Sequence, residues 1–425
     1  MKKFNFQTFM VFFILSATVA LAYQIPYLRY TFYDQFAAAY QFSNTQIGLL
    51  ASALTFTNTI CYPIGGFVAD KFSTKTLICI TLAAFAVLTA IFALTTNFIV
   101  LIIVHILYGF FGIATLWSAY LNGIRNLADK DNQSKIFGSS EATRGIIQTI
   151  MGFAFLGILG VMASDAAGIK AVLLFGSGAC AVFFVLALIF LPKTEIKAET
   201  LDSAENSGKK YSLMEVLKNK GVWVTIFVIM FAYISWTVSN GYLTTYTVQV
   251  LNISPATASA LGIVRSYIIV LLAGFIGGFV LDKFTYKGKG FLVFFIAIIA
   301  AIIGVMFTST AVPLCIALTL VIAFLANIMK STYWSIMDQA GVPLGMTAIA
   351  TGIISFIAFI PDFLVGPVCG KWLDDAAAAG NVAAGFDKIF ILLIVSSAIG
   401  IVSAILLTKR TKKLESQQKK SEAAD

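Results

Sequence analysis

Six ionisable side chains interrupt the long apolar stretches of this sequence: Arg29, Glu141, Arg144, Arg265, Lys330 and Asp362. An ionised group is costly in a low-dielectric interior, so such charges usually line a polar cavity or pair with one another. Cations outnumber acids here, and a guanidinium fork binds a carboxylate or phosphate in bidentate fashion. The set predicts a site for a small anion, with Arg29, Arg144 and Lys330 as ligands and Asp362 or Glu141 as proton-responsive groups.

Two of these cations also have a structural interpretation. Arg29 could bury its stem and extend its guanidinium to a polar surface. Glu141 and Arg144 are three residues apart, so on one helix face they could simply neutralise each other.

Lys330 and Asp362 also have structural interpretations. Lys330 could reach Asp338 only across about two helical turns. Asp362 follows Pro361, where a helix is expected to kink. Its carboxylate could bond the backbone groups that the kink frees, instead of exchanging a proton.

Aromatic and amide side chains could complete the site. Trp117 and Trp334 are 217 residues apart and each precedes a serine, while Asn240 adds a polar edge near Trp236. We expect Trp117, Trp334 and Asn240 to contact the bound solute, although a tryptophan can also belong to an interfacial aromatic belt. For His105, the only histidine, a hydrogen-bonded packing role is favoured over proton transfer.

The elements that position these residues are membrane helices. A soluble chain carries about 25% charged residues, whereas this 425-residue chain carries 12% charged and 59% hydrophobic residues. Its apolar runs reach the ~20 residues needed to cross a bilayer core. We predict an all-α polytopic membrane protein with twelve spans, at 8–33, 46–70, 76–95, 98–124, 136–163, 169–191, 221–250, 256–281, 289–308, 313–338, 344–370 and 387–408.

The net charge of +9 is unevenly distributed between the loops. Lys and Arg gather on one side of the predicted threading, which places both termini in the cytoplasm and favours a lipid bilayer over nucleic acid as the partner. We predict a short helix at Leu213–Leu217 and a disordered tail from Lys412. The predicted regions are an N-terminal six-helix bundle, a cytoplasmic linker, a C-terminal six-helix bundle and a cytoplasmic tail, at 1–191, 192–220, 221–408 and 409–425.

One stretch of sequence occurs twice. Gly65 to Lys75 reads GGFVADKFSTK and Gly277 to Lys287 reads GGFVLDKFTYK, with eight of eleven positions identical and a displacement of 212 residues. Each copy joins two apolar runs on the predicted cytoplasmic side. Glycine pairs in the copies predict close helix packing, and the repeat predicts two pseudo-symmetric halves.

The repeated stretch resembles the signature of the major facilitator superfamily, between the second and third of twelve helices. The resemblance covers nearly the whole chain and implies two six-helix halves that rock about a central cavity, with Arg29 and Lys330 on helices that line it. It assigns a gating role to Gly66, Asp70, Lys71, Lys75, Asp282 and Lys283. Where the family often has glycine after the acid–base pair, this chain has Phe72 and Phe284.

A second, local resemblance is to organophosphate:phosphate antiporters and their uncharacterised bacterial relatives. It rests on Tyr27-Leu28-Arg29, on the run from Phe137 to Gly145, and on Ser355 with Pro361-Asp362. The resemblance implies Arg29 as an anion ligand. The arginine that it would require in the seventh helix is missing.

These patterns predict a secondary active transporter that moves a small anionic organic solute by alternating access, coupled to protons or to anion exchange. The alternatives are a proton-coupled carrier of neutral sugars, a drug exporter, a membrane-embedded enzyme or a receptor. The sequence contains no GxxxxGK[ST] phosphate loop and no HExxH or GxSxG motif, so we expect no enzyme activity, cofactor or metal. We expect a monomer in a bacterial inner membrane.

Overall fold

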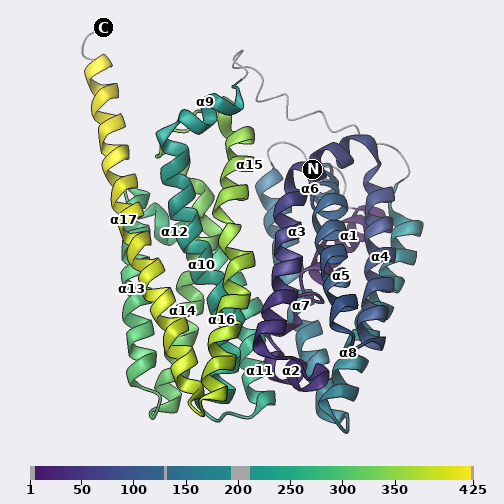
Figure 1. The fold of residues 1–425 in the computed structure, drawn as a ribbon. Helices are drawn as coiled ribbons and strands as arrows, with labels where there is room; N and C mark the ends of the chain where they lie inside the picture. The colour runs from purple at the N-terminus through teal and green to yellow at the C-terminus, as the bar shows by residue number, and fades with distance from the viewer. Residues whose placement is uncertain (1–4, 129–131, 193–210, 423–425) are drawn as a thin grey trace. The chain divides into compact units, whose positions relative to one another are not determined.

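The computed structural model describes residues 5–128, 132–192 and 211–422, and this part of the chain is helical without strands (Figure 1). Ten helical segments are long and apolar enough to cross a membrane. The other two predicted spans correspond to α1 (Phe6–Ala22) and α3 (Asn44–Lys71). The predicted all-α polytopic class is therefore confirmed.

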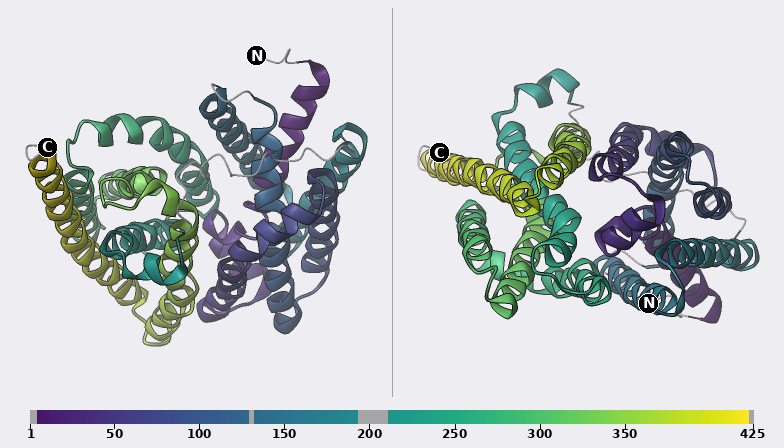
Figure 2. Two further views of the ribbon diagram at one scale, coloured as in Figure 1. Left: turned by 90° about the horizontal axis from the view of Figure 1, so that it is seen from above. Right: turned by 60° about the horizontal axis from the view of Figure 1, so that its bottom comes forward.

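Short helical turns divide several of the spans. Before the linker, the further helices are η1 (Leu28–Tyr30), α2 (Tyr33–Tyr40), α4 (Thr74–Leu94), α5 (Phe98–Gly109), η2 (Phe110–Trp117), α6 (Ser118–Arg125), α7 (Gln133–Val161) and α8 (Asp165–Phe190). After it come α9 (Leu213–Lys218), α10 (Lys220–Gln249), α11 (Pro255–Ile263), η5 (Val264–Ile268), α12 (Ile269–Asp282), α13 (Lys287–Phe307), α14 (Val312–Thr332), η6 (Tyr333–Ile336), η7 (Leu344–Met346), α15 (Thr347–Ala358), α16 (Ile360–Ala378) and α17 (Val382–Glu422). Figure 2 gives two further views of these helices.

The chain forms two compact units, which are described separately. Unit 1 contains Met1–Thr200, Asn252–Leu271 and Phe363–Asp375, and unit 2 contains the rest. Unit 1 thus includes α11, η5 and the middle of α16 together with the N-terminal helices. Residues 193–210, most of the predicted linker, lie outside the described residues, and the predicted domain boundaries stay a prediction.

The first predicted span, 8–33, is wrong as a single helix. The helix α1 ends at Ala22, and a turn leads to η1 and α2. Pro26 has no N–H to donate to the carbonyl of Ala22, and its ring disfavours a helical conformation in the residue before it. Arg29 is consequently held on a short 3-10 turn instead of on a continuous helix.

Three helix starts follow from side-chain caps. The predicted capping box at the start of α3 is present, because Ser43 accepts from the N–H of Gln46 and the Gln46 side chain bonds the N–H of Ser43. Ser254 caps α11 with Pro255 in the first turn, also as predicted. The predicted surface helix is α9, whose own capping box pairs Ser212 with Glu215.

The prediction of a disordered tail is wrong for residues 412–422, since α17 continues through them. Tertiary contacts in unit 2 hold this end: Thr411 donates to the carbonyl of Gln339 at 2.9 Å, and Tyr286 donates to Glu415 at 3.1 Å. The latter bond, to a carboxylate, raises the pKa of Tyr286. Lys, Glu and Gln are also good helix formers, so propensity and packing act together.

In unit 1, Asp374 of α16 binds the first turn of α3. Its two carboxylate oxygens accept the backbone N–H groups of Asn44 and Thr45 at 2.9 and 2.8 Å, and the side chains of both residues at 2.9 and 2.6 Å. A negative charge also complements the positive end of the helix dipole. The two helices approach closely beside this contact, because a Cβ on Gly48 would lie 2.3 Å from the carbonyl oxygen of Gly366.

Replacing Asp374 by Ala should destabilise the protein by about 1–3 kcal/mol, because four donors at the start of α3 lose their acceptor. The measurement is thermal unfolding of the purified protein in detergent. Asp375→Ala is the matched control, since Asp375 is exposed and pairs only at the surface with Lys371. Equal effects of the two substitutions would contradict the assignment.

Candidate functional site

A group of polar and aromatic side chains in unit 2 brings together two of the sequence-predicted charges. We call it the Trp236 cluster; it consists of Tyr233, Trp236 and Thr237 of α10, Asn327 and Lys330 of α14, and Asp362 of α16. The cluster thus joins a predicted anion ligand and a predicted proton-responsive group through the residues of one helix.

Lys330 packs on the face of Trp236. Its Nζ lies 3.3 Å from the ring centroid, a cation–π contact. The indole is itself fixed, because its Nε1–H donates to Asn327 Oδ1 at 3.0 Å, while Asn327 Nδ2 donates to the carbonyl of Ala323. The ammonium group is therefore held on the face of an indole that is itself fixed by Asn327.

Asp362 accepts two hydrogen bonds from α10. Tyr233 donates to Oδ2 at 3.2 Å and Thr237 donates to Oδ1 at 2.6 Å. The predicted kink is present, since α15 ends at Ala358 and α16 starts at Ile360. Asp362 nevertheless bonds side chains of another helix, as well as making its local backbone contact to Phe359.

Sequence reasoning missed Tyr233, Thr237 and Asn327. Tyr233 and Thr237 are spaced i, i+4, which puts both on one face of α10. This spacing indicates a polar face on α10, but it indicates a binding site for a carboxylate only when Asp362 is known to lie opposite. Asn240, which was predicted, donates to the carbonyl of Trp236 at 2.9 Å and is 5% exposed.

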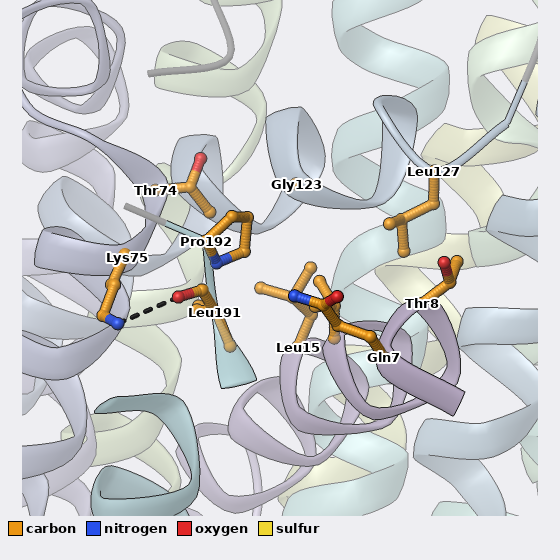
Figure 3. A pocket seen from close by; sticks show the side chains of 10 residues that line it. Gln7, Thr8, Leu15, Thr74, Lys75, Gly123, Leu127, Leu191 and Pro192 are labelled. Atoms are coloured by element: carbon orange, nitrogen blue, oxygen red, sulfur yellow. Dashed lines mark hydrogen bonds between the residues drawn. The ribbon is translucent and has the colours of Figure 1, made fainter. Parts of the chain in front are cut away.

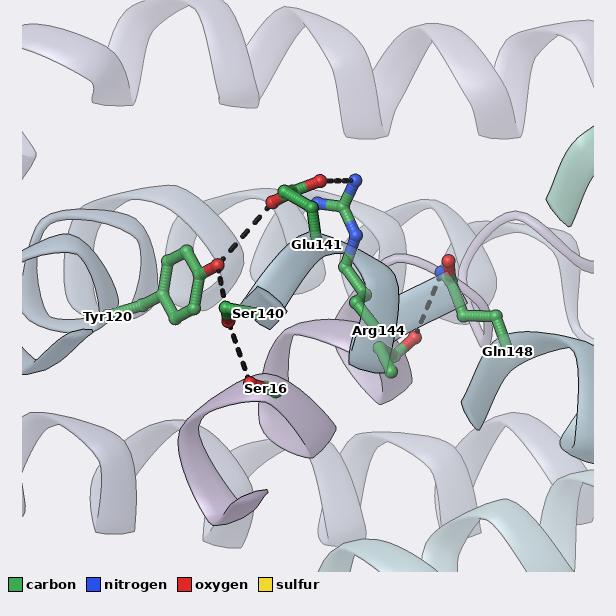
Figure 4. Close-up of polar contacts among 7 residues, drawn as sticks. Ser16, Tyr120, Ser140, Glu141, Arg144 and Gln148 are labelled. Carbon is green, nitrogen blue, oxygen red and sulfur yellow. Dashed lines mark hydrogen bonds and ion pairs between the residues drawn. The ribbon is translucent and has the colours of Figure 1, made fainter. Parts of the chain in front are cut away.

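In unit 1, Glu141 and Arg144 of α7 form an ion pair, as Figure 4 shows. The arrangement matches the structural interpretation of these residues, mutual neutralisation on one helix face. Glu141 is also hydrogen-bonded by Tyr120 of α6, at 3.4 Å. The Glu141 side chain is 46% exposed and that of Arg144 is 21% exposed, so the pair is not sealed from its surroundings.

A chain of hydroxyl groups continues from this pair into the core of unit 1 (Figure 4). Tyr120 lies 2.9 Å from Ser140, and Ser140 lies 2.7 Å from Ser16 of α1. Ser16 donates to the carbonyl of Phe12, so Ser140 must be the donor toward Ser16. Ser140 must in turn accept from Tyr120, so the hydrogen bonds run from Tyr120 through Ser140 and Ser16 to the carbonyl of Phe12. The single hydrogen of the Tyr120 hydroxyl is shared between Ser140 and the Glu141 carboxylate.

A group of contacting aromatic rings lies in the same part of unit 1. The ring of Trp117 contacts those of Tyr23 and Tyr120, with centroids 6.0 and 5.8 Å apart. Tyr23 also stacks on Tyr27 at 6.2 Å. The half-buried Trp117 thus belongs to an aromatic cluster, whereas the half-buried Trp334 contacts Tyr333 beside it on η6.

Arg29 does not extend to a polar surface, because only 9% of it is exposed. Its guanidinium carbon lies 4.5 Å from the ring centroid of Tyr30, and Nη2 donates to the Tyr30 hydroxyl at 3.3 Å. Arg29 and His105 border a small cavity of about 10 Å³, which is about the space of one water molecule. His105 Nδ1 lies 2.8 Å from the carbonyl of Leu101, and its ring packs edge-on against Phe92, which fits the predicted packing role.

The duplicated stretch packs alike in both units at its first glycine. A Cβ on Gly65 would lie 3.0 Å from the carbonyl oxygen of Ile113 and 3.2 Å from Ser118 Oγ, and a Cβ on Gly277 would lie 3.0 Å from Ser331 Oγ. Close packing at the second glycine is a wrong prediction for Gly278, which faces open space.

The acid–base residues of the two copies lie at helix ends. Gly66 and Asp70 belong to α3, but the surroundings of Gly66 and the side chain of Asp70 are outside the described part of the structure. Lys71, Asp282 and Lys283 are exposed.

Lys75 binds the C-terminal end of α8. Its Nζ donates to the carbonyls of Leu188 and Leu191 at 2.6 and 2.9 Å, satisfying groups that a helix end leaves without partners. Lys75 borders a pocket of about 160 Å³ between α1, α4, α6 and the end of α8 (Figure 3). Its counterpart Lys287 donates instead to the carbonyl of Ser335 at 3.1 Å, so identical residues have different partners.

Comparisons with known proteins agree with the helical membrane fold described above. The profile of the Major Facilitator Superfamily matches residues 5–366, and the chain belongs to this family. It is a multi-pass membrane transporter and not an enzyme, with the family's fold of twelve transmembrane helices in two pseudo-symmetric six-helix bundles.

Two relatives and one solved structure are similar to this chain over most of their length. The chain is 25% identical to the inner membrane protein YqcE of Escherichia coli, over 86% of this chain and 87% of YqcE. It is 22% identical to the hexuronate transporter of Bacillus subtilis, over 78% and 80% of the two chains. Its fold resembles that of a bacterial homologue of the human lysosomal transporter Spinster, with a TM-score of 0.74, 14% identity, and coverage of 96% and 98%.

Replacing Lys75 by Met should lower the free energy of unfolding by about 1–2 kcal/mol, because two carbonyls at the end of α8 lose a cationic donor. Thermal unfolding in detergent measures this effect. Lys71→Met, an exposed lysine of the same repeat, is the control and should change stability by less than about 0.5 kcal/mol. A Lys75 variant as stable as the control would show that the contact does not support the fold.

Proposed function

We propose that this transporter carries a small anionic organic solute by alternating access, driven by protons or by exchange for another anion. The observation that carries the proposal is the Trp236 cluster, in which Lys330 and Asp362 flank side chains of α10. A cation held on an aromatic face can attract an anion, and a carboxylate on the same helix face can respond to protonation.

The chemistry of the solute is best matched by a sugar acid. A relative at 22% identity is named as a hexuronate transporter, and a hexuronate carries one carboxylate on a hydroxylated ring. We assign Lys330, Arg29 and Arg144 to the carboxylate, and Trp117, Trp334 and Asn240 to the ring. Aromatic faces stack on the apolar side of a sugar, while amides bond its hydroxyl groups.

Proton coupling is assigned to Asp362 and Glu141. Ionised Asp362 accepts from Tyr233 and Thr237, but a protonated carboxyl group has a donor of its own and fewer acceptor positions. Protonation would therefore loosen α16 from α10. At Glu141, protonation would release Arg144 from its ion pair and free the guanidinium for the substrate.

The repeated stretch is assigned to cytoplasmic gating, through Gly66, Asp70, Lys71, Lys75, Asp282 and Lys283. We place the protein in a bacterial inner membrane with both termini in the cytoplasm, since the cationic loops lie on one side. We also propose that it functions as a monomer.

Proteoliposomes containing the purified protein should accumulate glucuronate and galacturonate and not glucose or galactose, which lack the carboxylate. In Lys330→Met, the KM for glucuronate should rise about 10- to 100-fold, because a charge-assisted contact is worth roughly 1.5–3 kcal/mol. Lys289→Met, an exposed lysine on α13, is the control. Uptake of neutral hexoses that glucuronate does not inhibit would contradict the proposed substrate class.

Replacing Asp362 by Asn should abolish the acceleration of uptake by an imposed pH gradient while leaving counterflow of preloaded glucuronate. The amide cannot exchange a proton at physiological pH but can still accept a bond from Thr237 or Tyr233. The measurement compares uptake with and without the gradient, with Asp375→Asn as the control. Unchanged gradient dependence in Asp362→Asn would remove Asp362 from the coupling mechanism.

A further inference from the structure

Arg265 is a buried cation whose fork has no partner. It lies on η5 in unit 1, and 2% of it is exposed. Its Nε donates to the carbonyl of Leu261, at a long 3.4 Å. Nη1 and Nη2 are both buried and make no hydrogen bond to the described residues.

The lack of hydrogen-bond partners for both Nη groups distinguishes Arg265 from the other buried polar groups of the described residues. Six buried side-chain nitrogen and oxygen atoms of the described residues lack hydrogen-bond partners; the four outside Arg265 belong to neutral side chains. Arg29 and Arg144, by contrast, have side-chain partners: Arg29 donates to Tyr30, and Arg144 pairs with Glu141. Since a guanidinium stays charged in proteins, burial without a partner is strongly unfavourable unless another state of the protein supplies one.

The backbone around Arg265 is also unusual. The residues Val264–Ile268 form a π-helical turn inside a span that is otherwise α-helical. Such turns occur mostly as single insertions, frequently at functional sites, because they re-aim the side chains that they carry.

The acid of α7, Glu141, is not this partner in the described structure. Two residues, about half a helical turn, separate Arg265 from Ile263, which packs on Gly152 of α7. Arg265 forms no ion pair with Glu141 of α7 among the described residues. Glu141 of α7 is already paired with Arg144.

A planar fork with two open Nη groups matches a carboxylate, which accepts both in parallel. We infer that Arg265 binds the carboxylate of the transported solute through Nη1 and Nη2, in a conformation in which helix movement opens access to it. This inference rests on the proposed function and deepens it, by naming the residue that fixes the orientation of the acid group. In this structure the guanidinium of Arg265 is buried and inaccessible to a solute.

The first test needs no substrate. In Tris chloride without other anions, Arg265→Met should unfold a few degrees above the wild type, because the substitution removes an unpartnered buried charge and keeps an apolar stem. Arg410→Met is the matched control; Arg410 donates through Nε to the carbonyl of Ala340, so its loss should lower the melting temperature. A lower melting temperature for Arg265→Met would mean that the guanidinium supports the fold, and would overturn the inference.

The second test uses glucuronate, acetate and inorganic phosphate as probes in the same thermal-unfolding assay. A ligand that binds only the folded protein raises its melting temperature. We expect glucuronate and acetate to do so for the wild type and for Arg410→Met. The shift should be absent in Arg265→Met and reduced in Arg265→Lys, which keeps the charge without the fork. A wild type that responds to no carboxylate, or an Arg265→Met that responds fully, would overturn the inference.

Uptake assays separate this inference from the proposed function. If wild type and Arg265→Met take up glucuronate with equal KM, the inference fails and the proposed function stands. If neither takes up any anion but carboxylate binding still depends on Arg265, the proposed function fails and the binding site stands.

Discussion

The cost of an ionised group in a low-dielectric interior constrains most of what is distinctive in this structure. Asp362 is satisfied by two hydroxyl groups of α10, Glu141 by Arg144 and Tyr120, and Lys330 by the face of Trp236. Each of these contacts joins two helices or two turns of one helix. Under the proposed function, a change of protonation or the arrival of an anion alters these contacts, so the same cost that restricts the charges also couples them to helix movement.

The helix α10 has a central role because three of its residues serve two different charges. Trp236 supports Lys330 from α14, while Tyr233 and Thr237 bind Asp362 from α16. The rings of Tyr233 and Trp236 are in contact, with centroids 5.3 Å apart. A change at Asp362 can therefore reach Lys330 through two packed side chains, Tyr233 and Trp236.

Sequence reasoning recovered the class of fold, the spans and the helix caps, because hydrophobic run length and capping residues act locally. It failed at the first span, where Pro26 outweighs a continuous apolar run, and at the tail, where contacts from Tyr286 and Gln339 stabilise a helix whose composition suggested disorder. For the candidate site, it identified Lys330 and Asp362 as charges in apolar helices. Tyr233, which bonds Asp362, and Asn327, which bonds Trp236, could not be found, because each lies more than 90 positions from its partner on another helix and only tertiary packing brings them together.

The duplicated stretch shows how two halves of similar sequence acquire different roles. Gly65 and Gly277 sustain the same close helix contact, so the scaffold of the repeat is retained. Lys75 and Lys287 occupy matching positions, yet the first binds the end of α8 and the second binds η6. The charged residues diverge further: unit 1 pairs Glu141 with Arg144, whereas in unit 2 Lys330 stacks on Trp236 and Asp362 bonds hydroxyl groups. Pseudo-symmetry therefore accounts for the scaffold of the two halves, and under the proposed function the solute is selected at the positions where the repeat is broken.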